Sequence, residues 1–250
     1  MLVDKQQRFS ITADTATIGS SIKFENSSDN VLFNHYQQFM TGKGKEINKL
    51  KDSYKTSTSK KDSAAIREKL IKLDEDIAAF RNDIIKNYPG NILTALLMTM
   101  KEPALTGRLK NPKTKEDSLA SWQYYKDHFW DDVSFYDGRI AYTTFFEEKL
   151  DKYFNQVVVP HPDSVIKELD WMLGTATINL EMTRFLLIKF VNRYLNQKYM
   201  WEDAVFLYLF EKYFAQKEHS WLTAAGKKVI TDRAYSLMAN IMGTPASDIE

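Results

Sequence analysis

The stretch from Asn179 to Phe214 is the most apolar part of the chain, and its few polar positions are regularly spaced. In its first half, a single polar stripe is formed by Lys189, Asn192, Arg193 and Asn196. Residues three, four and seven apart share one helix face, so this spacing predicts a helix whose other faces are buried. The second half, residues 200–216, contains seven consecutive apolar residues and neither Gly nor Pro, which favours a helix over a strand. We therefore expect two buried helices at the centre of an all-helical domain.

Two apolar seams with four–three spacing come earlier in the chain. The first is formed by Tyr36, Met40, Ile47, Leu50 and Tyr54, and the second by Ile66, Leu70, Leu73, Ile77, Phe80 and Ile84. Because the polar turn at residues 55–63 joins them, they predict an antiparallel helical hairpin. Pro89 and Gly90 end this hairpin, and residues 91–100 predict a short, deeply buried helix.

Helical patterns return after residue 117. They cover residues 118–130 and 142–158, a third segment that starts near Pro162, the central pair, and a last segment from about Leu222. Successive helices of ~15–20 residues with short links predict an array of antiparallel helices, similar in architecture to helical-repeat proteins. No sequence motif repeats at a fixed period.

The first 26 residues have a different pattern, because residues 8–12 and 22–24 alternate between polar and apolar positions. Two or three short strands do not form a stable sheet alone, so we interpret this segment as the remnant of a small β domain. The predicted fold class is all-α, with this β remnant at the N-terminus. The predicted domains are residues 1–26 (β remnant), 27–243 (helical domain, with hairpin 27–101, connector 102–117 and array 118–243) and 244–250 (linker).

Composition excludes several kinds of chemistry. The formal net charge is +1, which by itself indicates neither a nucleic-acid nor an anionic-membrane partner. The absence of Cys excludes disulfides, thiolate metal sites and a Cys nucleophile. The central apolar run is too short to span a bilayer, and no signal-peptide pattern opens the sequence. The connector holds four cations without an acid between them, which indicates a solvated linker more than a basic binding loop.

Catalytic motifs are absent from the sequence. None of the four His belongs to an HExxH motif, and no GxGxxG, GxxxxGK[ST] or GxSxG motif is present. His128 with Asp131 and Asp132 offers metal-ligand types at helical spacing, but such combinations arise often on helix surfaces. We therefore predict no metal, no cofactor and no catalytic residue.

The most unusual segment is the aromatic-rich stretch of residues 122–142. Its candidate binding residues are Trp122, Tyr125, His128, Trp130, Asp137 and Arg139. One interpretation is a groove of aromatic rings with an acid and an Arg, suited to a peptide or a sugar. The other is a helix end packed on the core, with Asp137 or Arg139 bonding to the backbone. Four further tyrosines are interpreted as core residues, namely Tyr194, Tyr199, Tyr208 and Tyr213.

Three segments carry a family resemblance. They are YYKDHFWDDVSFYDGRI (124–140), VVVPHPDSVIKELDWML (157–173) and MWEDAVFLYLFEKYF (200–214). They resemble a helical domain of unknown function from envelope proteins of anaerobic Gram-negative bacteria. Residues 9–40 resemble the end of the small β domain that precedes it there. Residues 241–249 resemble the lead-in to the TlpA/ResA-like thioredoxin domain that follows it.

This resemblance implies a role without implying a catalytic residue. The family's thioredoxin domain uses a Cys-x-x-Cys pair, whereas this chain has no Cys. The chain would then be a non-catalytic accessory domain of an envelope or periplasmic thiol–disulfide oxidoreductase, cut from a longer polypeptide. Its partners would be protein or peptide substrates of the redox domain. The alternatives are a structural spacer, a peptide- or carbohydrate-binding helical module, or an independent enzyme.

Overall fold

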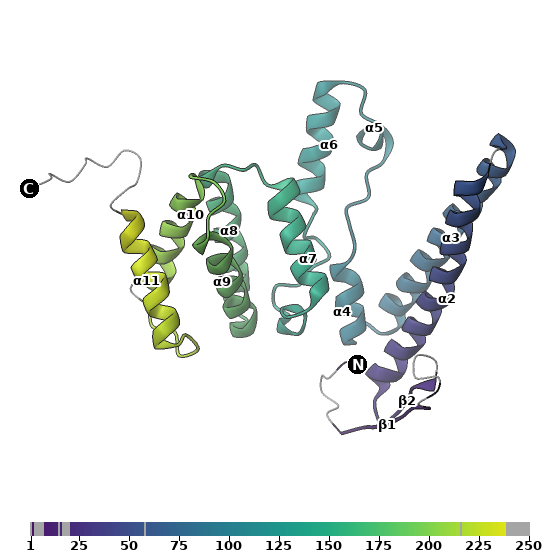
Figure 1. The fold of residues 1–250 in the computed structure, drawn as a ribbon, viewed down its shortest axis with the longest axis horizontal. Helices are drawn as coiled ribbons and strands as arrows, with labels where there is room; N and C mark the ends of the chain where they lie inside the picture. Colours follow the sequence, from purple (N-terminus) through teal and green to yellow (C-terminus); the bar gives the residue numbers. More distant parts are fainter. Residues whose placement is uncertain are drawn as a thin grey trace, which may run out of the picture. The chain divides into compact units, whose positions relative to one another are not determined.

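A computed structural model describes residues 2, 8–14, 16, 21–57, 59–215 and 217–238. The chain forms two compact units, Met1–Lys101 (unit 1) and Glu102–Glu250 (unit 2). The described part contains ten α-helices and one two-stranded antiparallel sheet (Figure 1). The predicted all-α class with a short β segment near the N-terminus is therefore confirmed. The finer domain boundaries stay a prediction, and the predicted linker at residues 244–250 lies outside the described residues.

Unit 1 consists of the small sheet and three helices. Strands β1 (Ser10–Thr12) and β2 (Lys23–Glu25) pair with Ile11 opposite Phe24. The helices are α2 (Ser28–Thr56), α3 (Lys60–Asn87) and α4 (Ile92–Thr99). The Ser27 hydroxyl accepts a hydrogen bond from the Asn30 backbone N–H (3.3 Å), so a capping residue fixes the start of α2.

The expected antiparallel hairpin is α2 with α3, which lie side by side (Figure 1). Its base contains a buried cluster that includes Leu32, Ile84 and Leu97. Further out the packing thins, and no described residue between 37 and 72 is buried. The outer half of the hairpin is therefore a two-helix arm with a half-buried seam.

Unit 2 holds the remaining helices. They are α5 (Gly107–Lys110), α6 (Lys115–Asp127), α7 (Thr144–Lys152), α8 (Pro162–Ala176), α9 (Leu180–Leu195), α10 (Glu202–Leu209) and α11 (Ala224–Met238). A 3-10 turn covers Gly138–Ile140, and single π-helical turns cover Tyr153–Val157 and Phe210–Phe214.

The predicted central pair is α9 with α10. Met182, Leu186 and Phe190 on α9 are fully buried, and so are Val205 and Phe206 on α10. Helices α8 and α11 pack against the same pair. The helix expected over 118–130 ends earlier, because His128 already leaves the helical conformation as the C-cap of α6. Among the described residues, no helix is long and apolar enough to cross a membrane.

Candidate functional site

The first two candidates from the aromatic segment, Trp122 and Tyr125, serve to attach α6. The Trp122 indole N–H donates a hydrogen bond to the carbonyl of Val157 (3.1 Å). The Tyr125 hydroxyl donates to a Glu102 carboxylate oxygen (2.5 Å), which the Lys152 ammonium also contacts (2.7 Å). Both side chains therefore join helix α6 to neighbouring parts of unit 2.

Trp130 belongs to the core of unit 2. Only 6% of its surface is exposed. Its ring packs edge-on against Phe129, Phe135 and Tyr153 at centroid distances of 5.0 to 5.4 Å. A side chain in this position stabilises the fold through aromatic packing, and a ligand on the surface does not reach it.

The polar candidates make local contacts. His128 Nδ1 lies 2.6 Å from an Asp131 carboxylate oxygen on the exposed surface. Asp137 accepts hydrogen bonds from the Arg139 backbone N–H (3.1 Å) and from its guanidinium Nε (2.8 Å). The Arg139 guanidinium holds the pKa of Asp137 below its ordinary value. Asp137 thus caps the 3-10 turn through these hydrogen bonds. Separately, the described residues contain no group of three or more His, Cys, Asp or Glu side chains that could hold a metal ion.

The geometry of the six candidates agrees with the second interpretation of the aromatic segment. Trp130 is in the core, Asp137 and Arg139 pair with each other, and His128 pairs with a surface acid. None of these six residues lines any of the four cavities that the structure describes. A binding role for any of them stays a prediction without a geometric argument in its favour.

A buried lysine next to this segment was not anticipated from the sequence. Lys149 on α7 is 7% exposed, and its ammonium lies 4.8 Å from the centroid of the Phe129 ring. Burial lowers its pKa to about 8, although the nearby carboxylates of Glu102 and Asp132 oppose this shift. Lysines are usually exposed, so no sequence pattern distinguishes this one.

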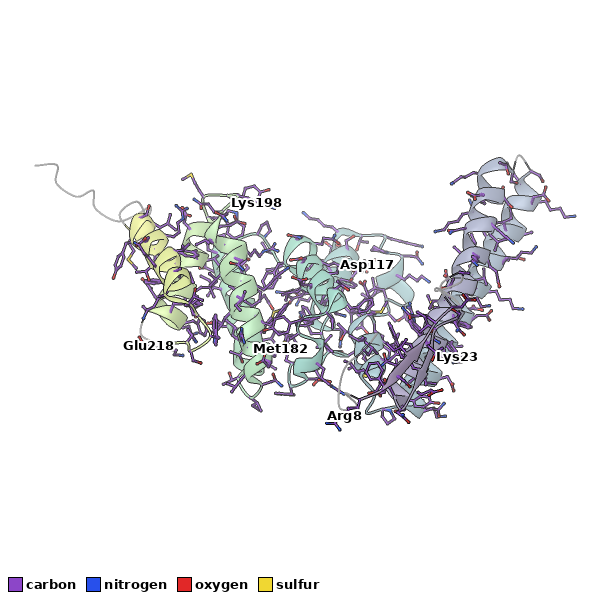
Figure 2. All side chains as sticks on the ribbon, turned by 60° about the horizontal axis from the view of Figure 1, so that its bottom comes forward. Arg8, Lys23, Asp117, Met182, Lys198 and Glu218 are labelled. Atoms are coloured by element: carbon purple, nitrogen blue, oxygen red, sulfur yellow. The ribbon has the colours of Figure 1, made fainter. Side chains whose placement is uncertain are left out.

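The described cavity of greatest interest lies along α9. It has a volume of about 860 Å³, within the usual range for ligand sites. We call it the α9 groove. Its lining includes Asp151, Asn155, Lys189, Asn192, Arg193, Asn196, Lys198, Tyr199, Trp201 and Glu202. These residues come from the end of α7 and the π-helical turn after it, from α9, and from the loop before α10; Figure 2 labels Lys198 in this loop.

Most of the charges inside the α9 groove are paired with one another, whereas the Lys198 ammonium is exposed and makes no ion pair with a described residue. The Lys189 ammonium contacts Glu147 (2.9 Å) and Asp151 (3.2 Å). Arg193 contacts the other oxygen of Asp151 (3.3 Å) and the side-chain oxygen of Asn155 (2.5 Å). Burial alone would lower the pKa of Lys189, but the hydrogen bonds to the two carboxylates outweigh it and raise the pKa. The two cations are thus held in place and largely neutralised.

A buried carboxylate fixes the loop that closes the groove. Glu202, the first residue of α10, is buried. One of its oxygens accepts hydrogen bonds from the backbone N–H groups of Lys198 (2.5 Å) and Tyr199 (3.2 Å). An acid is also favourable at a helix N-terminus. The loop is therefore held in one conformation beside α9.

The polar and aromatic groups left available in the groove are few. Asn192 and Asn196 are exposed, and their side chains have no hydrogen-bond partner within the described part of the chain. The rings of Tyr199 and Trp201 are parallel, with centroids 6.3 Å apart and an interplanar angle of 6°. Such an arrangement can bind a ligand through hydrogen bonds and ring contacts.

Only part of the α9 groove is predictable from the sequence. The spacing of Lys189, Asn192, Arg193 and Asn196 predicts one polar stripe on a helix whose other faces are buried, but it does not predict a groove beside that stripe. The prediction that Tyr199 is a core aromatic is wrong, because 61% of its surface is exposed. Tyr194 is buried as expected. Tyr199 differs because it follows α9 in a loop, where helical spacing says nothing about burial.

The α9 groove lies within the part of the chain that matches a known protein family. Residues 99–240, more than half of the chain, match a family model described as a domain of unknown function, DUF5106. The matched part includes every residue that lines the α9 groove. No curated protein and no solved structure matches the chain. The match bears out the resemblance to a domain of unknown function and carries no information on a thioredoxin-like neighbour.

Proposed function

The chain belongs to the DUF5106 family, and on that premise we propose that it is a non-catalytic binding module whose α9 groove holds an extended peptide segment. The observation that carries this proposal is the pair of exposed amides, Asn192 and Asn196, beside a parallel pair of aromatic rings. The absence of Cys is consistent with a role other than thiol chemistry for this chain.

The spacing of the two amides suits a peptide backbone. Asn192 and Asn196 are four residues apart, which corresponds to about 6 Å along a helix axis. An extended peptide advances about 6.6 Å for every two residues. Each primary amide both donates and accepts hydrogen bonds, as a peptide group does. The two side chains can therefore pair with alternate peptide groups of one extended segment.

The rest of the groove provides apolar contact and one exposed ammonium, that of Lys198. Tyr199 and Trp201 present flat rings on which an apolar side chain of the peptide can rest. Lys189 and Arg193 are already paired with Asp151, so the ligand does not need to be acidic. Because Glu202 fixes the loop before binding, the loop loses little conformational entropy when the peptide binds.

Peptide selection tests this proposal. Peptides are selected from a random library with the whole chain, and their Kd is measured by fluorescence anisotropy. The double variant Asn192→Ala/Asn196→Ala is expected to weaken binding about 25-fold, at about fivefold for each lost side-chain amide. The matched control is Asn48→Ala/Asn82→Ala, which removes two exposed helical Asn in unit 1 and is expected to leave the Kd unchanged.

Two results would contradict the proposal. Failure to select any peptide would favour the structural spacer. Groove-dependent binding of an oligosaccharide, with no peptide binding, would favour the carbohydrate-binding alternative.

A finer proposal is that this chain is part of a longer polypeptide. The resemblance described above supports a role in which this module positions protein or peptide substrates for an attached thioredoxin-like redox domain in the bacterial envelope. Sequencing the gene beyond the codon for Glu250 tests it, together with fractionation of cells that express the natural protein. A reading frame with no downstream Cys-x-x-Cys domain, or a protein found outside the envelope, would contradict this part alone.

A further inference from the structure

The outer half of the α2–α3 hairpin has an unusual concentration of positive charge. We call residues 41–72 the basic arm. They contain ten Lys or Arg and four Asp or Glu, a formal net charge of +6, whereas the whole chain has a net charge of +1. The remainder of the chain is accordingly −5. The near-neutral total therefore conceals two regions of opposite sign.

Most of these cations are exposed and have no ionic partner. Lys43 pairs with Asp76 (2.8 Å), Lys55 pairs with Asp52 (3.2 Å), and the Arg67 Nε donates to the Tyr54 hydroxyl (3.1 Å). The other seven are exposed and make no ion pair with any described residue: Lys45, Lys49, Lys51, Lys60, Lys61, Lys69 and Lys72. These seven ammonium groups are thus free to interact with an external partner.

Lysines from both helices of the hairpin line one groove. A groove of about 420 Å³ opens along the arm, and its lining includes Lys49 from α2 with Lys69 and Lys72 from α3. The acids in this groove are Glu46 and Asp76, and Asp76 is already paired with Lys43. The lining of this groove therefore carries a net positive charge, with four Lys against two acids.

We propose that the basic arm docks on an anionic lipid surface by electrostatic attraction. Nine of its ten cations are Lys, which acts as a hydrated point charge suited to a diffuse field rather than as a bidentate fork for one phosphate. Lysines near an anionic membrane each strengthen binding by about fivefold. The turn between the helices is polar, so the arm lies on the headgroups without inserting into the bilayer.

The side chains favour a lipid surface over a nucleic acid. Proteins that bind single strands present aromatic side chains on which bases stack. The arm contains one aromatic residue, Tyr54, and the Arg67 guanidinium lies 5.4 Å from the centroid of its ring. An Arg-rich surface for bidentate phosphate contacts is absent from the arm as well, because Arg67 is its single Arg.

Vesicle co-sedimentation of the whole chain tests this proposal. One set of vesicles is phosphatidylcholine alone, and in the other about one third of the lipid is phosphatidylglycerol, at a salt concentration of about 0.1 M. We expect binding to the anionic vesicles only. Lys49→Gln/Lys51→Gln/Lys69→Gln/Lys72→Gln is expected to weaken binding on the order of 100-fold or more, while circular dichroism shows that it remains folded.

Two further variants keep the test falsifiable. Lys110→Gln/Lys113→Gln/Lys115→Gln/Lys167→Gln removes the same charge from exposed positions of unit 2 and is expected to retain binding. Replacing the four arm lysines by Arg keeps the charge and is also expected to retain it. Equal losses in the arm variant and the unit 2 variant, or no binding to anionic vesicles, would overturn the proposal. Arm-dependent binding to random-sequence duplex DNA that is tighter than binding to the vesicles would overturn it as well.

Discussion

The α9 groove and the basic arm both contain several cations, but they hold them in opposite ways. In the groove, Lys189 and Arg193 share the carboxylate of Asp151 and are largely removed from water. In the arm, seven lysines are exposed and without an ionic partner among the described residues. The groove is therefore pre-organised for a ligand of specific shape, whereas the arm generates a field that any nearby anionic surface experiences.

The largest expected difference between the two regions concerns packing. Phe190 is fully buried behind the groove, and its ring lies 5.3 Å from that of Phe154. Phe190→Ala should destabilise unit 2 by about 3–5 kcal/mol. Leu50→Ala in the half-buried seam of the arm should cost about 1 kcal/mol or less, because little apolar surface is lost from contact.

Denaturant unfolding measures both effects. All five Trp lie in unit 2, so intrinsic fluorescence follows the groove side of the comparison, and circular dichroism includes the helices of the arm. If Phe190→Ala lowers the free energy of unfolding as little as Leu50→Ala does, the core behind the groove is no more tightly packed than the seam of the arm.

The second prediction compares a buried lysine with an exposed one. Burial lowers the pKa of Lys149 to about 8 in the folded state, from the ordinary lysine value of 10.5. Between these two pH values, the unfolded chain therefore binds more protons than the folded chain. The free energy of unfolding should rise with pH across this window because of Lys149. Lys149→Met should remove that rise and stabilise unit 2 at pH 7 by up to about 3 kcal/mol.

The control for this prediction is Lys51→Met on the arm, which is exposed and should change stability little. Urea unfolding followed by Trp fluorescence at pH 7 and above pH 10 measures the difference. If Lys149→Met instead destabilises unit 2 at pH 7 but not above pH 10, the charged form of Lys149 stabilises the fold and the prediction is wrong.

The smallest expected effect comes from breaking the shared carboxylate of the groove. Asp151→Asn leaves Lys189 and Arg193 with less compensation, so the pKa of Lys189 should fall. The free energy of unfolding should decrease by about 1 kcal/mol or less, because the Asp151 side chain is partly exposed. Asp52→Asn removes an exposed partner of Lys55 on the arm and should have no measurable effect. Equal effects would mean that the groove pairs are ordinary surface pairs.

The sequence predicted those parts of the fold that depend on regular spacing. The seams of residues 36–54 and 66–84 predicted α2 and α3, and the apolar stretch after Asn179 predicted α9 and α10. Helical spacing identifies a buried face because the same geometry repeats at every turn. The net charge of the arm can also be counted from the sequence, but the net charge of the whole chain, +1, does not reveal it.

The candidate site depends on contacts that do not repeat. Trp130 belongs to a conspicuous aromatic segment, yet its ring is buried among residues from other elements. Tyr199 and Trp201 reach the groove because Glu202 ties their loop to α10 through backbone hydrogen bonds. Lys149 is buried by tertiary packing against Phe129. Single contacts of this kind leave no periodic signal, so the sequence does not reveal them.

The most direct test of the contrast between paired and unpaired cations is salt dependence. Binding of a selected peptide to the α9 groove and binding of anionic vesicles are measured with the same chain as salt rises from about 0.05 to 0.5 M. Peptide binding should change much less than vesicle binding, because Lys189 and Arg193 of the groove are paired within the protein. Vesicle binding should fall steeply. A steep loss of peptide binding, or vesicle binding that is indifferent to salt, would contradict the account.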